Sequence, residues 1–143
     1  MRSSALLALT FLFLLSFGSA QQQTLFPVPQ RLDIHSKILN EDRVIWVRTP
    51  PGYEQGKAVF PVLYETDAPG HMGESGSTAD FLMASDRMPP IIVVGIANTD
   101  RTRDLTPSHA DMKNPDGTVA QFPTSGGADK FLDFIQTELI PEI

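Results

Sequence analysis

The chain has 143 residues, a formal net charge of −6 and no cysteine. Because no disulfide can form, the fold depends on a buried core. The acidic balance and the absence of a basic patch argue against nucleic acid and anionic lipid as partners.

The first twenty residues have the pattern of a cleavable secretory signal. Arg2 gives a positive start, residues 5–17 are apolar apart from one threonine, and the small residues 18–20 follow. The apolar run is shorter than the roughly 20 residues that span a bilayer. We expect cleavage after Ala20 and a secreted or periplasmic protein with no membrane attachment; an uncleaved anchor is the alternative.

Residues 21–30 are polar and proline-containing, and we expect them to form an N-terminal arm before a single partial domain at 31–143. Two strand-like runs, "LDIHSKIL" and "RVIWVRT", flank residues 40–42, which predicts a hairpin. Both faces of the second run are apolar, so we expect this strand to be covered on both sides.

The next segment predicts a strand, a loop and a short helix. "FPVLYETD" at 60–67 has the pattern of a strand, and the glycine-rich run 68–77 predicts a loop. Ser77 or Thr78 is expected to cap a short helix, which the prolines at 89 and 90 stop.

The last third of the chain predicts a buried strand, a long loop and a helix. "IIVVGIAN" at 91–98 is continuously apolar and predicts a buried, parallel strand. The loop at 104–127 is rich in proline and glycine, and loops of this length are usually functional or disordered. The helix is expected at 128–140, with Pro141 ending it. Its apolar positions recur every four residues: Phe131, Ile135 and Leu139. This order of elements predicts the opening half of an α/β sheet.

Charged residues directly follow the predicted buried strand. Open α/β sheets bind ligands beyond the carboxyl ends of their strands, so Arg101, Arg103 and Asp104 are candidates for the rim of a site. The alternative is internal pairing, in which Arg101 or Arg103 holds Asp100 or Asp104 and braces the loop.

Two other groups of residues are candidates for metal binding or catalysis. Asp67, His71 and Glu74 could ligate a metal, although their spacing matches no known signature, and a polar loop is the alternative. Neither Ser75 nor Ser125 lies in a G-x-S-x-G turn, and no histidine follows Ser125. We therefore expect no catalytic residue, no metal and no cofactor within the chain.

Three segments, "FPVLYETDAPGHM", "IIVVGIANTDRTRDLTP" and "GGADKFLDFIQTELIPEI", resemble the putative esterase family of α/β-hydrolases. The family includes enterochelin-esterase-like siderophore hydrolases, S-formylglutathione hydrolases and mycolyltransferase antigens. The resemblance covers roughly residues 30–143 and is most specific at 95–107. It implies the N-terminal half of an α/β-hydrolase fold: a mixed sheet with an antiparallel N-terminal hairpin and helices on its faces, truncated before the nucleophile strand.

The resemblance also implies a function. It suggests the N-terminal portion of an exported carboxylic-ester hydrolase that cleaves a small-molecule ester through a serine nucleophile and an acyl-enzyme. The family's catalytic triad would lie beyond residue 143, so we expect the chain as written to be inactive. Arg101, Arg103 and Asp104 match the family's loop at the edge of the active-site cleft. The alternative is a catalytically silent periplasmic binding or accessory domain of the same fold.

One further family feature falls inside the chain, in the loop that helps to stabilise the oxyanion. Asp67, Ala68, Pro69 and Gly70 occupy its place. Proline has no N–H, so if Pro69 aligns with the donor, Gly70 must donate instead or the oxyanion hole is impaired.

Overall fold

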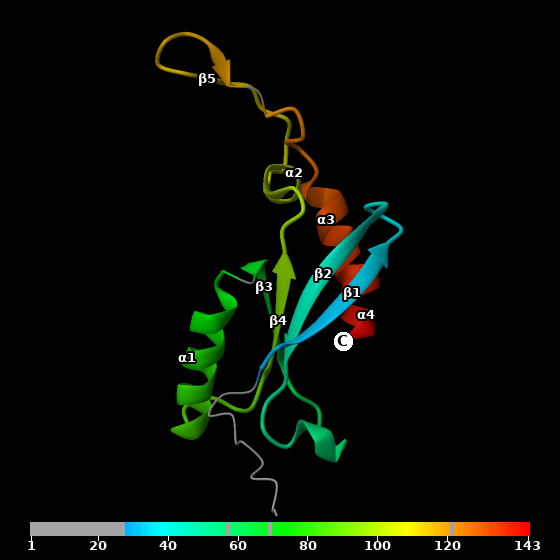
Figure 1. The fold of residues 1–143 in the computed structure, drawn as a ribbon, viewed down its shortest axis with the longest axis vertical. Helices are drawn as coiled ribbons and strands as arrows, with labels where there is room; N and C mark the ends of the chain where they lie inside the picture. The colour runs from blue at the N-terminus through cyan, green and yellow to red at the C-terminus, as the bar shows by residue number, and fades with distance from the viewer. Residues whose placement is uncertain (1–27, 57, 69, 121) are drawn as a thin grey trace, which may run out of the picture.

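The computed structural model describes residues 28–56, 58–68, 70–120 and 122–143. The expected signal peptide and most of the expected N-terminal arm lie outside these residues. A four-stranded sheet in the order β1-β2-β4-β3 has α1 against one face and the C-terminal helical segment against the other (Figure 1). No helix in the described part of the chain is long and apolar enough to cross a membrane. The predicted α/β class and mixed sheet are confirmed.

The N-terminal hairpin forms one side of the sheet. Strands β1 (Gln30–Ser36) and β2 (Glu41–Arg48) pair antiparallel, as predicted. The turn comes earlier than expected: Asn40 closes it at a φ of 54°, a left-handed conformation that asparagine tolerates. Glu41 already pairs with Ser36 in the ladder. After β2, the chain makes one 3-10 turn, η1 (Tyr53–Gln55).

The centre of the fold is a parallel strand–helix–strand unit. Strand β3 (Val62–Ala68) leads to helix α1 (Met72–Ala84) and then to β4 (Ile92–Ala97). β4 pairs in parallel with β3 and antiparallel with β2, and residues 92–96 are all buried. This confirms the predicted buried parallel strand. Within the described sheet β3 has β4 as its one neighbour and forms an edge.

Helix α1 corrects the sequence prediction at its start. It begins at Met72, so Ser77 and Thr78 lie inside the helix and do not cap it. A Cβ atom at Gly76 would lie 3.2 Å from the side chain of Arg48, which donates to the Gly76 carbonyl at 3.0 Å. Glycine in this segment thus allows close packing against the sheet, whereas the sequence suggested a loop.

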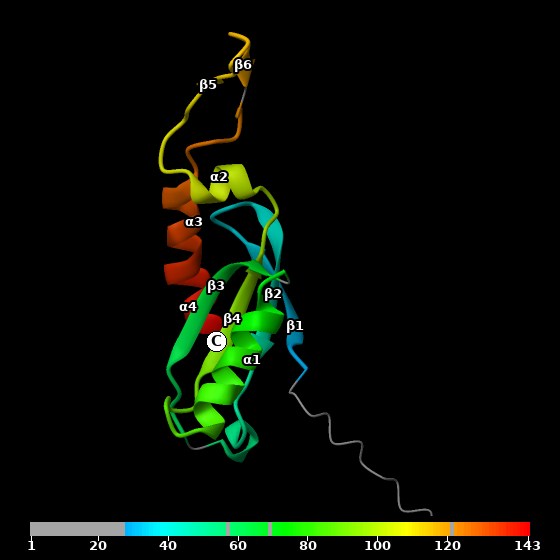
Figure 2. The ribbon, with the colours of Figure 1, turned by 90° about the vertical axis from the view of Figure 1, so that its left-hand side faces the viewer.

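The connection after β4 contains more structure than the predicted loop. Helix α2 (Arg101–Leu105) follows β4 at once, and Asp100 caps it by accepting the N–H of Arg103 at 3.0 Å. Strands β5 (Met112–Lys113) and β6 (Val119–Ala120) form a small ribbon. Figures 1 and 2 show this ribbon extending away from the sheet beyond α2.

The C-terminal helical segment consists of α3 (Ala128–Phe134), the π-helical turn η2 (Ile135–Leu139) and α4 (Ile140–Glu142). The prediction that Pro141 ends the helix is wrong. Proline lacks an N–H and clashes with the carbonyl four residues before it in a regular α-helix. Here the N–H of Ile140 donates to the carbonyl five residues earlier, so the helix is already widened before the proline.

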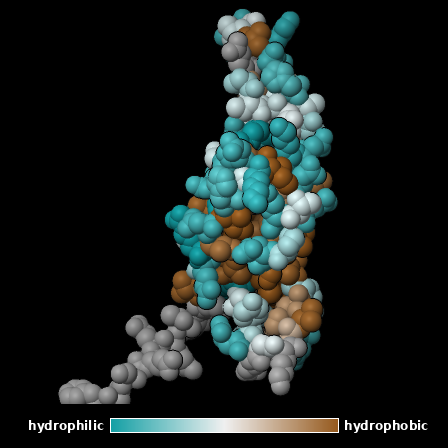
Figure 3. Space-filling view, turned by 90° about the vertical axis from the view of Figure 1, so that its right-hand side faces the viewer, coloured by the Kyte–Doolittle hydropathy of each residue, from teal (hydrophilic) through white to brown (hydrophobic). Residues whose placement is uncertain are grey.

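The main core lies between the sheet and the C-terminal helical segment. Of the predicted apolar repeat, Phe131 and Leu139 are buried, while Ile135 is partly buried and Phe134 is buried beside them. The widened turn explains this, because it brings Phe134 and Leu139, which are five positions apart, to the same side of the helix. Figure 3 shows apolar residues exposed on this side of the molecule. The buried residues of this core are Ile45, Ile92, Val94, Ile96, Phe131, Phe134 and Leu139.

Candidate functional site

The two turns that leave the carboxyl ends of β3 and β4 contact each other. The carboxylate of Asp67, at the end of β3, accepts hydrogen bonds from the Asn98 side chain and from Arg101. The Nε and Nη2 atoms of Arg101 lie 2.9 Å and 3.4 Å from its oxygens. Arg101, and after it Asn98, hold the pKa of the Asp67 carboxyl below its ordinary value. The expected oxyanion loop and cleft rim are therefore joined by an ion pair.

The main chain at the end of β3 is tightly constrained. Asp67 has a φ of 63°, in the left-handed region that few non-glycine residues adopt. Ala68 is buried, and a Cβ atom placed on Gly95 of β4 would lie 2.6 Å from the Ala68 Cβ. The N–H of Gly70 donates to the Asp67 carbonyl at 3.0 Å. The candidate donor Gly70 is thus engaged within its own turn, and Pro69 lies outside the described residues.

Helix α1 begins directly after this turn. Its N-cap residue, His71, makes no side-chain capping hydrogen bond. The first N–H groups of a helix have no acceptor within the helix, and they carry partial positive charge. The first turn of α1 therefore presents N–H donors close to the carboxyl end of β3.

Beneath the loop after β4 lies a buried arginine. The guanidinium of Arg43 is fully buried and donates to Asp104 at 2.7 Å and to the carbonyl of Ala97 at 3.0 Å. It also lies over two rings of α3, 5.1 Å from the centroid of Phe131 and 5.8 Å from that of Phe134. Asp104 is itself buried, so it lies below the rim and anchors the loop to the sheet.

Arg103 completes this buried charge cluster. Its two Nη atoms lie 2.9 Å and 2.6 Å from the oxygens of Glu41, and its Nε donates to Asp104 at 2.8 Å. Glu41 raises the pKa of Arg103, and Arg103 lowers the pKa of Glu41. Arg103 and Asp104 therefore form an internal pair. Arg101 instead reaches Asp67 across the edge, with 66% of its side chain exposed.

The long connection brings together a serine and an imidazole that the order of residues had argued against. Ser125 Oγ lies 3.1 Å from His109 Nδ1, and His109 Nε2 lies 3.7 Å from Asp111. The Ser125 hydroxyl also donates to the Phe122 carbonyl at 2.7 Å. Since a hydroxyl has one proton, His109 is left as the donor and cannot act as the base for Ser125 in this arrangement.

The surroundings of Ser125 also lack the donors that acyl transfer needs. The N–H of Gly126 donates to Thr106 Oγ1 at 2.7 Å, and that of Gly127 donates to the Arg103 carbonyl at 3.0 Å. Both amides that follow the serine are therefore occupied, and neither can stabilise an oxyanion. A serine, an imidazole and a carboxylate thus lie together in this connection, but their hydrogen bonds stabilise a turn.

The possible metal site has no support in the geometry. Among the described residues, no three histidine, aspartate or glutamate side chains are grouped so as to hold a metal ion. Asp67 faces Asn98 and Arg101, and Glu74 lies in the first turn of α1.

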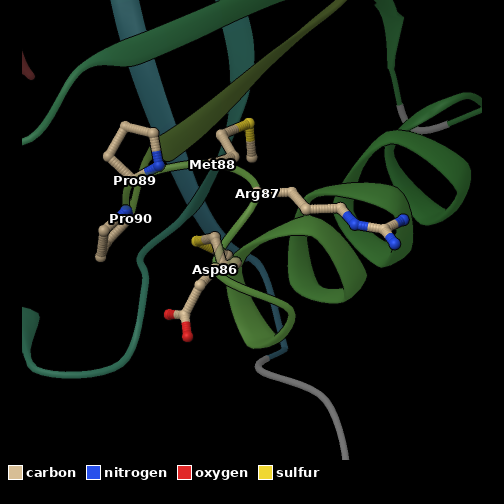
Figure 4. A pocket seen from close by; sticks show the side chains of 6 residues that line it. Asp86, Arg87, Met88, Pro89 and Pro90 are labelled. Carbon is tan, nitrogen blue, oxygen red and sulfur yellow. The ribbon is translucent and has the colours of Figure 1, made fainter.

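A pocket of about 230 Å³ lies beside the candidate site. Its lining residues are Arg101, Thr102, Leu105, Thr106, Ala110, Phe122 and Ser125. Another pocket, of about 410 Å³, lies at the opposite end of α1, where Asp86 and Arg87 point in different directions (Figure 4). Charged groups converge at the carboxyl ends of β3 and β4 and not in this second pocket. We therefore place the candidate site at the carboxyl ends of these two strands.

Comparison with known proteins identifies the family. The chain matches the family described as "Putative esterase" over residues 36–143. The chain belongs to this family. The resemblance found in the sequence is therefore confirmed, while no curated protein gives a significant match.

Solved structures of related proteins share the fold. An IroE-like serine hydrolase from Shewanella oneidensis is 37% identical, with a TM-score of 0.74 over 80% of this chain and 37% of its own. The BES protein from Bacillus cereus is 24% identical, with a TM-score of 0.66 over 85% of this chain and 50% of its own. The enterobactin esterase FES from Shigella flexneri is 18% identical, with a TM-score of 0.56 over 80% and 25%. The chain thus spans at most half the length of these three structures.

Sequence reasoning missed several residues of the site region. Asn98 ends the apolar run that forms β4, and a polar residue at the carboxyl end of a buried strand was a usable signal. Arg43 lies in a strand with two apolar faces, and an arginine buried there requires an acidic partner. Its partner, Asp104, is 61 residues away, so no local pattern could identify it.

Proposed function

We propose that this chain is the N-terminal portion of an exported carboxylic-ester hydrolase. In this proposal the rest of the domain supplies a serine that attacks a small-molecule ester and forms an acyl-enzyme. Family membership supports ester hydrolysis, and the absence of G-x-S-x-G from the 143 residues supports a nucleophile outside them. The observation that carries the proposal is the Asp67–Arg101 ion pair, which joins two turns beside the uncapped start of α1.

The turn between β3 and α1 would stabilise the oxyanion. A tetrahedral intermediate needs N–H donors aimed at its developing negative charge. The Gly70 N–H is already used by the Asp67 carbonyl, so the N–H of the N-cap residue His71 and the first N–H groups of α1 are the better donors. The positive end of the helix would add to their effect.

The pocket of about 230 Å³ would bind one part of the ester. Leu105 and Phe122 give it apolar walls, and Arg101 contributes a cation. Such a pocket suits an apolar acyl or aryl group that carries a polar substituent.

An assay with p-nitrophenyl esters tests the hydrolase proposal. We expect no saturable turnover from the 143-residue chain. The coding sequence downstream should encode G-x-S-x-G within about 20–40 codons, and the extended polypeptide should hydrolyse the ester until that serine is replaced by alanine. Saturable turnover by the short chain would refute its inactivity, and an inactive extended polypeptide would refute the hydrolase.

The internal hydrogen bond of Gly70 favours one alternative, a catalytically silent binding or accessory domain of the same fold. A stop codon with no G-x-S-x-G beyond it would support this alternative. A monomer of residues 21–143 that unfolds cooperatively and protects its amides from exchange would also support it, because a partial hydrolase domain should be marginally stable or aggregate.

Export is tested separately. The pattern of residues 1–20 leads us to propose cleavage after Ala20 and a periplasmic or secreted product. Mass spectrometry of protein expressed with its own N-terminus should find a chain that starts at Gln21. An intact Met1 in a soluble cell fraction would contradict export.

A further inference from the structure

The end of β3 is unusual in its main chain. The structure describes three non-glycine residues with positive φ: Asn40, Asp67 and Asp86. Asn40 closes the hairpin, and Asp86 follows the end of α1, where such a conformation is common. Asp67 instead lies inside a strand, and the pairing of β3 with β4 shifts register between Glu65 and Ala68. A shift of this kind redirects the chain that follows it.

Contacts from the neighbouring turn hold this conformation. Both Asn98 and Arg101 donate to the Asp67 carboxylate, and 24% of the Asp67 side chain is exposed. On the other side of the strand, Ala68 is pressed against the main chain of β4 at Gly95. An uncommon φ persists only where its surroundings impose it, and these contacts do so here.

The turn that follows depends on the same residue. The Asp67 carbonyl accepts the Gly70 N–H at 3.0 Å, and α1 begins two residues after Gly70. Whatever fixes the Asp67 main chain therefore also fixes the direction of the N–H groups at the start of α1.

We propose that Asp67 is a positioning residue. The hydrogen bonds from Asn98 and Arg101 to its carboxylate stabilise the left-handed main chain. They thereby orient the N–H groups of the turn and of the first turn of α1. This inference rests on the proposed function for its use in catalysis, because those N–H groups are the expected oxyanion donors. Asp67 acts through the main chain and does not itself contact the substrate.

A pH titration followed by NMR tests these hydrogen bonds, in the longer polypeptide if the coding sequence continues with G-x-S-x-G and otherwise in residues 21–143. We expect the Gly70 amide resonance to shift as the Asp67 carboxyl is protonated, with a midpoint below that of an ordinary aspartate. Arg101→Met should move this midpoint upward, whereas Arg101→Lys should restore part of the difference. The charged groups that act on Asp67 are Arg101 and His71, so a His71→Gln background removes the response of the imidazole.

Two substitutions of Asp67 separate the effect of the carboxylate's hydrogen bonds from the tolerance of position 67 for the left-handed conformation. Asp67→Gly tolerates the left-handed conformation but removes the carboxylate, and Asp67→Asn tolerates it and keeps an uncharged acceptor. We expect amide exchange at Gly70 to become about tenfold faster in the glycine variant and less so in the asparagine variant. Exchange at the wild-type rate in Asp67→Gly, or a Gly70 resonance insensitive to carboxyl protonation, would overturn the proposal.

A matched control uses another arginine–aspartate pair. Arg31 contacts Asp33 at 2.7 Å on the exposed face of β1, away from this edge. Arg31→Met should leave Gly70 exchange unchanged. Resonances of β2 and β4 that match those of the wild type show that a variant is folded. If Asp67→Gly unfolds, the exchange rate at Gly70 in Asp67→Asn decides the test.

The outcomes also separate this inference from the proposed function. In an extended, active polypeptide, Asp67→Asn should lower kcat with little change in KM, because donor orientation matters most in the transition state. If the extended polypeptide does not hydrolyse esters, the proposed function fails while the NMR result stands. If the extended polypeptide hydrolyses esters but the Gly70 resonance does not respond to protonation of Asp67, only the positioning role fails.

Discussion

The two sides of the sheet are held in different ways. On the face that the C-terminal helical segment covers, seven buried apolar residues pack together. The buried cation of Arg43 lies on the same face, over two rings of α3, and is paired with Asp104. On the face that α1 covers, the buried apolar cluster consists of Met72, Ala79 and Val93. There, 42% of Leu63 and 61% of Phe81 are exposed.

This contrast matters because the candidate site spans both sides. Arg101 and Asn98 follow the central strand β4, in which residues 92–96 are all buried, while Asp67 lies near the end of the edge strand β3. A groove of about 290 Å³ also runs between β3 and α1. The ordering of the site thus depends on polar contacts that tie a less packed segment to a more packed one. The groove is lined by Leu63, Glu74, Ser75, Thr78, Ala79, Leu82, Met88 and Ile91.

The strongest test of the packed side removes its buried cation. Arg43→Ala should lower the free energy of unfolding by about 3–5 kcal/mol, because the buried carboxylate of Asp104 keeps only Arg103 as a cationic partner. The packing of the buried guanidinium on Phe131 and Phe134 is lost as well. Urea unfolding followed by circular dichroism, in the same polypeptide as the NMR experiment, measures this, with Arg31→Ala at an exposed pair as the control. Equal midpoints for the two variants would show that the buried cluster does not hold this side. The double variant Arg43→Met/Asp104→Leu should recover much of the loss.

The next test compares two leucines of the C-terminal helical segment. Leu139 is fully buried, so Leu139→Ala should cost about 2–5 kcal/mol. Leu132 is 51% exposed, and Leu132→Ala should change the stability by less than about 0.5 kcal/mol. The same urea experiment measures both. A large loss at Leu132 would mean that the exposed side of this helix is covered in solution.

A third test acts on the contact between the two sides. Gly95→Ala should cost about 1–3 kcal/mol, because its Cβ would overlap Ala68 and the sulfur of Met72. Gly73 is the control, since no atom lies within 4 Å of a Cβ placed there and alanine favours a helix by up to about 1 kcal/mol. If Gly95→Ala is as stable as the wild type, α1 and β3 move freely relative to β4.

The smallest expected effect is a pH dependence. Arg103, and to a lesser degree Arg43, lower the pKa of Glu41 in the folded state. Its contribution is therefore present above the ordinary glutamate pKa and lost as the pH falls through the lowered value. Urea midpoints measured from pH 7 to pH 3 should fall less steeply in Glu41→Gln than in the wild type. Parallel curves would show that Glu41 does not contribute.

Periodicity predicted the elements whose burial follows directly from their own side chains. The run from Ile92 to Ile96 is apolar at every position except one glycine, and its short length after two prolines favours a buried central strand. The hairpin and the C-terminal helix also carried clear patterns. The predicted boundaries of these elements were less accurate, as at Asn40 and Pro141, because the final turns depend on contacts with other parts of the chain.

The other elements depended on partners distant in the sequence. Gly73 and Gly76 argue against a helix locally, but the close approach of Arg48 makes a small residue necessary at position 76. The charges after β4 suggested a rim, whereas two of them pair with Glu41 and Arg43 of the hairpin. The position of ligand sites in open α/β sheets and the family resemblance both indicated this edge, and the Asp67–Arg101 pair emerged only from the fold.

The π-helical turn η2 has a consequence for the evolution of this segment. Its one additional residue lets both Phe134 and Leu139 face the sheet although five positions separate them. In a regular α-helix, that spacing would turn the second side chain well away from the first. We expect homologues that lack a proline at position 141 to carry a one-residue deletion here, so insertion of this residue and gain of the proline should be correlated among them.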